Sequence, residues 1–207
     1  MEGLATTRLT VPSGRAPAGL GLVQDLVNTA TRPAHAPSHV ADLLATEQSA
    51  NGWLSAALPQ WSAATGQPTP DLQLGEADLA PLRRLREAVR ALADAPEDGP
   101  PQGGPPRALP IPPGGTSVML RFDHDGRVRY GTAATGWRGV ASLVAAEILL
   151  AQHTGTWARF KACPYPSCGV AFFDHTRNNN RVWHDVKVCG NRTNLAASRQ
   201  RRMSVGA

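Results

Sequence analysis

The chain has 207 residues, 42% of them hydrophobic, which is enough for one domain of ordinary size and a small second unit. Its 18 Pro and 20 Gly predict generous loops. No run approaches the roughly 18 apolar residues of a membrane span, and the first residues lack the basic start and apolar core of a signal peptide. We therefore expect a cytoplasmic protein without membrane attachment.

Charge is distributed unevenly along the chain. Residues 157–207 hold nine Lys or Arg against two Asp, a net charge of +7, whereas the other 156 residues hold 12 basic and 14 acidic groups, a net charge of −2. This asymmetry favours a basic module that meets a polyanion, joined to a nearly neutral body. A solvated basic tail without a partner is the alternative.

The first part of the chain predicts short helices. Residues 1–17 have no periodicity and predict a flexible arm. Apolar residues then recur at helical spacing in two segments. The first predicts one short buried helix. The second begins at the N-cap candidate Ser38 and predicts two short helices, because Asn51-Gly52 should break it. The apolar positions are Leu22, Val23, Leu26 and Val27 in the first segment, and Val40, Leu43, Leu44, Trp53, Leu54 and Leu58 in the second.

The segment 78–95 predicts the clearest helix, with Asp78 as its N-cap and Pro81 in its first turn. Leucine and valine recur every three or four residues, and we expect its arginines to face solvent. The following residues, 95–115, are rich in Pro and Gly and predict a flexible excursion.

Alternating apolar residues on both sides of Asp125-Gly126 predict a β-hairpin packed on the helices. An apolar helix of about four turns, 137–154, ends at Gly155. We therefore divide the chain into an arm (1–17), a first domain (18–156), a C-terminal module (157–202) and a tail (203–207).

All three cysteines, Cys163, Cys168 and Cys189, lie within 27 residues of the module. A disulfide between the first two would leave the third unpaired and would be transient in a reducing cytoplasm. A nucleophilic cysteine would use His184 or His175 as its base. A zinc site explains more of the residues at once, because Cys163 and Cys168 form one close pair and His184 and Cys189 form another.

The sequence thus predicts a structural Cys₃His zinc site, with His175 as the rival for the fourth position. The histidines outside the module are remote from it. A unit of roughly 45 residues needs such a metal, because its own core is too small.

After Cys189 the residues favour a helix with a basic face. The candidate contacts to nucleic acid are Arg177, Arg181, Lys187, Asn191, Arg192, Arg199, Arg201 and Arg202.

The stretch 163–192 resembles the CGNR zinc finger family. The matching elements are the Cys pair, Gly169, the Phe-Phe-Asp and Asn-Arg stretches, Trp183, and Cys-Gly-Asn-Arg at 189–192. The family usually has Cys directly after the Trp, where this chain has His184. Imidazole is also a zinc ligand, so the resemblance still implies a metal site.

The segments "GLVQDLVNTA" and "DLAPLRRLREAVRAL" resemble the ABATE domain that usually precedes such fingers. Together these resemblances imply an α+β protein: a mostly helical domain with a β-hairpin, then a zinc-binding ββα module similar to a treble clef. They also imply a bacterial transcriptional regulator, associated with the nucleoid, whose finger binds double-stranded DNA.

In this interpretation the first domain senses a small-molecule effector or forms a homodimer, and the protein is not an enzyme. Two alternatives remain. One is a ligand-binding protein or enzyme in which the zinc module is purely structural, using polar residues such as Asp25, Asn28, Trp137 and Arg138. The other is an adaptor that binds RNA or protein.

Overall fold

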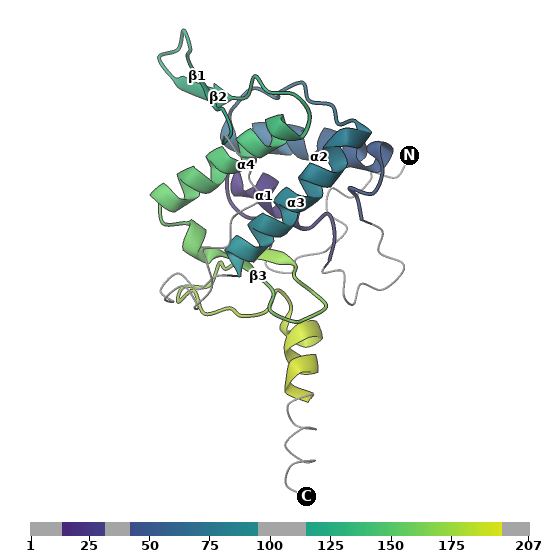
Figure 1. Ribbon diagram of the computed structural model, residues 1–207. Coiled ribbons are helices and arrows are strands. Elements are labelled where there is room, and N and C mark those ends of the chain that lie inside the picture. The colour runs from purple at the N-terminus through teal and green to yellow at the C-terminus, as the bar shows by residue number, and fades with distance from the viewer. Residues whose placement is uncertain (1–13, 32–41, 95–114, 196–207) are drawn as a thin grey trace, which may run out of the picture.

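The computed structural model describes residues 14–31, 42–94 and 115–195. The first domain contains the helices α1 (Leu20–Val27), α2 (Glu47–Thr65), α3 (Glu76–Ala93) and α4 (Gly136–His153), with the hairpin of β1 (Met119–Phe122) and β2 (Val128–Gly131) before α4. The turn η2 (Trp157–Arg159), a second hairpin of β3 (Phe160–Ala162) and β4 (Ala171–Phe173), and the turn η3 (Val186–Gly190) follow, and residues 191–195 are helical. Figure 1 shows the first hairpin and this last helix at opposite ends of the molecule. The order of elements confirms the α+β class and the ββα module.

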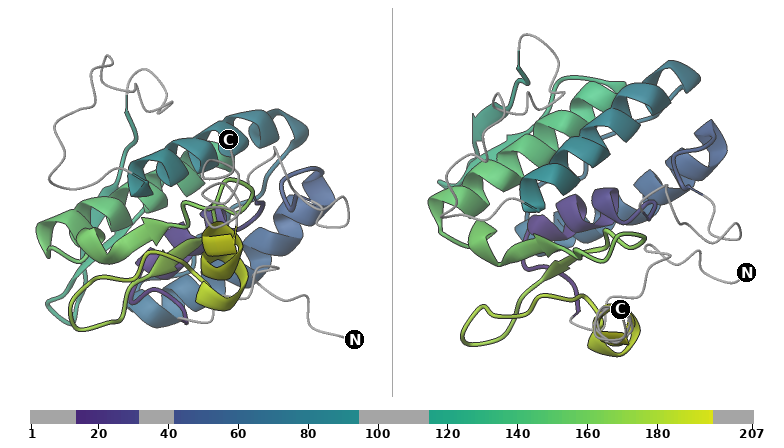
Figure 2. Two further views of the ribbon diagram at one scale, coloured as in Figure 1. Left: turned by 90° about the horizontal axis from the view of Figure 1, so that it is seen from below. Right: turned by 60° about the horizontal axis from the view of Figure 1, so that its bottom comes forward.

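Helix α1 is the centre of the helical domain. All eight of its residues are buried, and it contacts α2, α3, α4 and β4. Leu22, Val23, Leu26 and Val27 form its apolar side, and the polar Gln24 and Asp25 are buried with partners: Gln24 accepts the Ala16 N–H and Asp25 pairs with Arg15. The predicted short buried helix is confirmed, and Figure 2 shows it between the longer helices and the second hairpin.

The sequence predicted two short helices separated at Asn51-Gly52, and this prediction is wrong: residues 43–46 form turns and bends, and α2 begins at Glu47 and is unbroken. It begins after Thr46, whose hydroxyl accepts a backbone hydrogen bond in the first turn, and it continues through Asn51 and Gly52. The Asn51 side chain does not break the helix because it bonds elsewhere: it donates to Leu74 O at 2.8 Å and accepts from Leu74 N at 2.9 Å. Ser38, the predicted N-cap, lies outside the described residues.

Helix α3 confirms the predicted helix but begins at Glu76 with Gly75 as its N-cap, three residues before the predicted N-cap Asp78. Asp78 therefore lies inside the first turn. Its carboxylate accepts the Gly75 N–H at 2.9 Å and the Trp137 N–H at 3.1 Å, so it caps α3 and also ties the start of α4 to it.

The prediction that the arginines of α3 face solvent is wrong for Arg86 and Arg90. Both are buried. Burial is tolerated because their donors find acceptors: Arg86 donates to Asp42 at 2.6 Å and to Thr29 at 3.1 Å, and Arg90 donates to backbone carbonyls.

The hairpin at Asp125-Gly126 is confirmed, with Gly126 at a φ of 77° in the turn. It does not pack on the helices as predicted. Its apolar residues are largely exposed, Leu120 at 66% and Phe122 at 89%, because the strands extend beyond the ends of the helices (Figure 1). Strand β2 is nevertheless anchored to the helical domain. The Tyr130 hydroxyl donates to Glu147 at 2.6 Å, the Tyr130 N–H donates to Gln67 at 2.9 Å, and Arg129 donates to Gly66 O.

Helix α4 ends at His153 and the chain turns at Gly155, as predicted. Within the described ranges, no helix is long and apolar enough to cross a membrane. Most of the arm (1–17), nearly all of the excursion (95–115), His35 and His39, and the tail (203–207) lie outside those ranges.

Candidate metal centre

The first pair of candidate ligands lies in the loop between β3 and β4. Cys163 follows β3 directly, and its N–H donates to Val170 O at 2.9 Å, which extends the hairpin by one step. The Cys168 N–H donates to Tyr165 O at 2.9 Å and closes the loop into a tight turn. Gly169, which follows, has a φ of 66°, a conformation that favours glycine. The loop is therefore a knuckle that directs both sulfurs to one side.

The second pair comes from the segment that leads into η3. Asp185 begins this turn: its carboxylate accepts the N–H groups of Lys187 and Val188 at 2.8 and 3.2 Å. The N–H of Asn191 then bonds to Val186 O, five residues back, which widens the turn beyond that of an α-helix. This geometry places Cys189 on the inner side of the turn, where it is buried.

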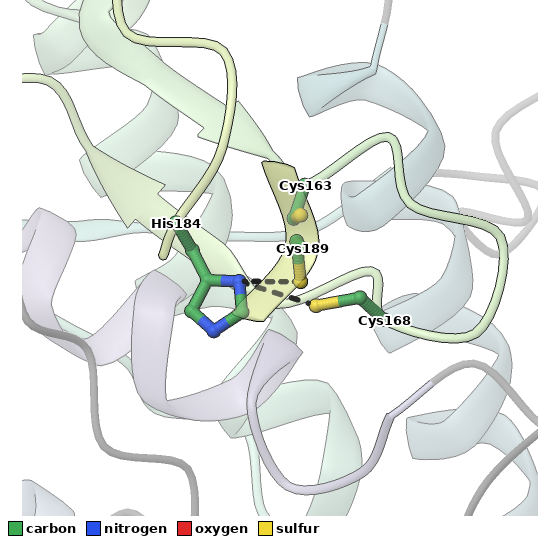
Figure 3. Close-up of side chains that lie close together, drawn as sticks. All are labelled: Cys163, Cys168, His184 and Cys189. Carbon is green, nitrogen blue, oxygen red and sulfur yellow. Dashed lines mark hydrogen bonds between the residues drawn. The ribbon is translucent and has the colours of Figure 1, made fainter. Parts of the chain in front are cut away.

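Cys163, Cys168, His184 and Cys189 converge on one point (Figure 3). Their candidate ligand atoms all lie within 4.8 Å of one another. His184 Nδ1 lies 3.3 Å from Cys168 Sγ and 3.6 Å from Cys189 Sγ. The two predicted pairs therefore form one cluster. His175 is not part of it, because it is exposed and its ring lies 4.9 Å from the ring of Phe173.

The geometry of the cluster fits zinc. A tetrahedral ion with Zn–S bonds of about 2.3 Å and Zn–N bonds of about 2.0 Å separates its ligand atoms by roughly 3.5 to 3.8 Å. The two nitrogen–sulfur distances of 3.3 and 3.6 Å are close to this spacing. The donor set of three thiols and one imidazole is typical of a structural zinc site, and none of the three cysteines forms a disulfide.

Electrostatics of the cluster also favours a cation. A hydrogen bond from Cys168 and others from His184 lower the pKa of the Cys163 thiol to about 4, despite its burial. The same hydrogen bond and burial raise the pKa of Cys168, and burial together with the charge of Cys163 raises that of Cys189 to about 11. One thiolate thus suppresses ionisation of the other two. A bound Zn²⁺ would remove this conflict, because it stabilises all three thiolates.

Asp174 organises the loop between the two pairs of ligands. It is fully buried, and it accepts hydrogen bonds from Lys161 Nζ at 2.8 Å, Thr176 Oγ1 at 2.6 Å and Arg181 N at 2.7 Å. Burial alone would raise its pKa, but these donors stabilise the carboxylate and bring the pKa well below its usual range. The sequence showed Asp174 only as part of the family resemblance.

Of the candidate contacts to nucleic acid, Arg177, Lys187, Asn191 and Arg192 are exposed. Arg181 is used inside the module: its Nε donates to Trp183 O at 2.9 Å and its Nη2 to His184 O at 2.6 Å. It therefore holds the peptide next to a metal ligand. Arg199, Arg201 and Arg202 lie outside the described residues.

The polar residues considered for a site in the first domain have structural partners. Asp25 pairs with Arg15 at 2.6 Å, and Asn28 bonds to the backbone of Ala171. Arg138 lies over the ring of Trp137, and the backbone N–H of Trp137 donates to Asp78. They do not converge on a common point as the metal ligands do.

The fold and the site define a protein in which a zinc finger module follows a helical domain. Residues 159–202 match the family model described as "CGNR zinc finger", and residues 20–152 match ABATE, described as "Putative stress-induced transcription regulator". The chain belongs to the ABATE family and carries a CGNR zinc finger after that domain. A comparison with curated proteins gives no match.

Proposed function

We propose that this protein is a transcriptional regulator that binds double-stranded DNA through its zinc finger. One observation carries the proposal. The turn η3 and the helix after it place Cys189 in the metal cluster while Lys187, Asn191 and Arg192 face outward. The metal would thus fix the orientation of an exposed helix that carries amide and guanidinium donors, the groups that contact phosphates and base edges.

The exposed charge of the module is mostly positive. Residues 157–195 contain six Lys or Arg and two Asp. Both carboxylates are used internally, since Asp174 is buried against Lys161 and Asp185 caps η3. Because Asp185 already binds the N–H groups of this turn, phosphate contacts would come from side chains, chiefly Arg177, Lys187 and Arg192.

The zinc would be structural. Four protein ligands leave no coordination position for a substrate, so we do not propose an enzyme. The helical domain would supply dimerisation or recognition of a small-molecule effector, and the protein would work at the nucleoid of a bacterial cell.

A protein-binding adaptor is the second candidate, because four apolar side chains of the finger are exposed. They are Val182, Val186, Val188 and Leu195. Apolar side chains beside basic ones also suit DNA, where they contact thymine methyl groups, so the basic surface decides our preference for DNA.

Fluorescence anisotropy with a mixed-sequence DNA duplex and an RNA of the same sequence tests the proposal. We expect the zinc-loaded protein to favour the duplex and to lose affinity steeply between about 50 and 200 mM salt. The double variant K187A/R192A should bind more weakly, and its salt slope should be smaller by about 0.9 for each phosphate that the variant no longer neutralises.

The matched control is Arg127→Ala, which removes an arginine whose side chain is 75% exposed at the tip of the other hairpin. It should bind DNA as the unchanged protein does. Equal losses of affinity in K187A/R192A and R127A would contradict the proposal, as would a preference for RNA or no binding to either nucleic acid.

A further inference from the structure

We propose that Arg90 and Asn28, two buried side chains of the helical domain, position the metal knuckle, so that zinc binding and folding of the helical domain are coupled. The metal ligands themselves all belong to the finger. The hydrogen bonds that hold their hairpin in place come from α1 and α3, far away in the sequence.

Arg90 joins the knuckle to two segments of the helical domain. Its Nη1 donates to Gly169 O at 2.5 Å, and its Nη2 donates to Val27 O at 3.0 Å and Ala30 O at 2.8 Å. Gly169 directly follows the ligand Cys168. The rigid guanidinium fork thus fixes the peptide next to a ligand against the C-terminal end of α1.

Asn28 pairs with the free edge of β4, which belongs to a two-stranded sheet. Its Nδ2 donates to Ala171 O at 3.0 Å and its Oδ1 accepts from Ala171 N at 2.8 Å, as a neighbouring strand would. Gln24 Nε2 donates to the same carbonyl at 3.3 Å. The strand that follows the knuckle is therefore held against α1 at Ala171.

The two faces of the second hairpin belong to different cores. Side chains alternate along a strand, so one face packs with the helical domain and the other surrounds the cysteines. The first face consists of Phe160, Ala162, Ala171 and Phe173. The second consists of Cys163, Cys168, Val170 and Phe172, joined by Cys189 and with Tyr165 and Trp183 packed against it.

These contacts make the coupling reciprocal. Metal captured by the finger fixes the hairpin that completes the helical core, so zinc should stabilise the helices as well. Conversely, loss of a helical-domain side chain that holds the hairpin should weaken zinc binding, because linked equilibria act equally in both directions.

The test uses the full chain with Arg90→Met, and zinc affinity is measured by competition with a chromophoric chelator. We expect affinity to fall by about 10- to 100-fold, as for other residues that orient metal ligands. The absorption spectrum of the Co²⁺-loaded variant should shift as the tetrahedral site distorts. Arg90→Lys keeps the charge but not the fork, and should have intermediate affinity.

Arg86→Met is the matched control. Arg86 lies one turn earlier on α3 and is also buried, but its partners Asp42, Thr29 and Glu87 belong to the helical domain. It should lower the unfolding temperature of the helices but, measured below that temperature, leave zinc affinity and the Co²⁺ spectrum unchanged. The proposal is overturned if R90M binds zinc as tightly as the unchanged protein, or if R86M loses as much affinity.

A second measurement does not depend on the folding of a variant. The thermal unfolding of the unchanged protein is followed by circular dichroism at the helical band, with zinc and after chelation. We expect one transition that moves to lower temperature when zinc is removed. A helical transition that is the same with and without zinc would overturn the proposal, because the finger would then fold independently.

Discussion

The side-chain amide of Asn28 pairs with both backbone groups of Ala171, donating to the carbonyl at 3.0 Å and accepting from the N–H at 2.8 Å. This contact joins the end of the first helix to a strand 143 residues later. The zinc finger is thus docked on the helical domain through buried hydrogen bonds. Under the proposed function, a change in the helices would reach the exposed surface of the finger through these contacts.

Asn28→Ala should lower both stability and zinc affinity. The substitution leaves the buried Ala171 N–H unsatisfied, at a cost of about 1 to 3 kcal/mol, whereas the Ala171 carbonyl keeps its hydrogen bond from Gln24 Nε2. Urea unfolding monitored by circular dichroism measures the first effect and chelator competition the second.

Asn51→Ala is its matched control, because Asn51 pairs in the same way with Leu74 inside the helical domain. It should lower the free energy of unfolding without changing zinc affinity under conditions where the variant remains folded. If both variants bind zinc equally well, Asn28 has no role in holding the finger.

His184→Cys should keep the zinc site, since a fourth thiolate is an accepted ligand and the family usually has Cys at this position. With Co²⁺ bound, the sulfur-to-metal charge-transfer absorption should gain intensity relative to the unchanged protein. His184→Ala should bind metal much more weakly, whereas His175→Ala should bind it normally because His175 lies outside the cluster. Normal metal binding by H184A and loss in H175A would reverse the assignment.

Asp25 should give the stability of the helical domain a distinctive pH dependence. Burial raises the pKa of its carboxyl to about 6, although Arg15 partly offsets the shift. The folded state therefore holds this proton to a higher pH than the unfolded state does. The stabilising contribution is present at low pH and is lost as the pH rises through the window between the ordinary pKa of 3.8 and about 6.

Asp25→Asn removes this titration. The free energy of unfolding of the variant, taken relative to that of the unchanged protein, should therefore rise by about 1 to 1.5 kcal/mol from about pH 5 to about pH 7.5. Urea unfolding of both zinc-loaded proteins at the two pH values gives the difference, in which the pH dependence of the metal site cancels. A difference that stays constant or falls with pH would show that Asp25 does not titrate in this range.

Much of the fold and nearly all of the metal cluster could be predicted from the sequence. Periodicity located α1, α3 and α4, because each buries a stripe of leucine and valine. The spacing of Cys163, Cys168, His184 and Cys189 identified the ligands, since thiol and imidazole pairs at such distances have few other uses. A single sequence therefore predicts features that depend on residues close together in the chain, such as hydrophobic periodicity and the spacing of metal ligands.

Contacts between distant segments could not be predicted in the same way. Asn51 looked like a helix breaker until its partner Leu74 was known, and the first hairpin looked amphipathic although its Leu120 and Phe122 are exposed. Arg86 and Arg90 offered a weak signal: they continue the apolar row of Leu82 at steps of four residues. Backbone carbonyls accept most of the hydrogen bonds of Arg90, and such acceptors leave no trace in the sequence.

The zinc content of the purified protein tests the central claim most directly. Elemental analysis of the full chain, expressed with zinc supplied, should give about one equivalent per chain, because the four ligands form a single tetrahedral site. Cys189→Ala should contain little or no zinc. A metal-free protein, or a C189A variant that retains a full equivalent, would contradict the account.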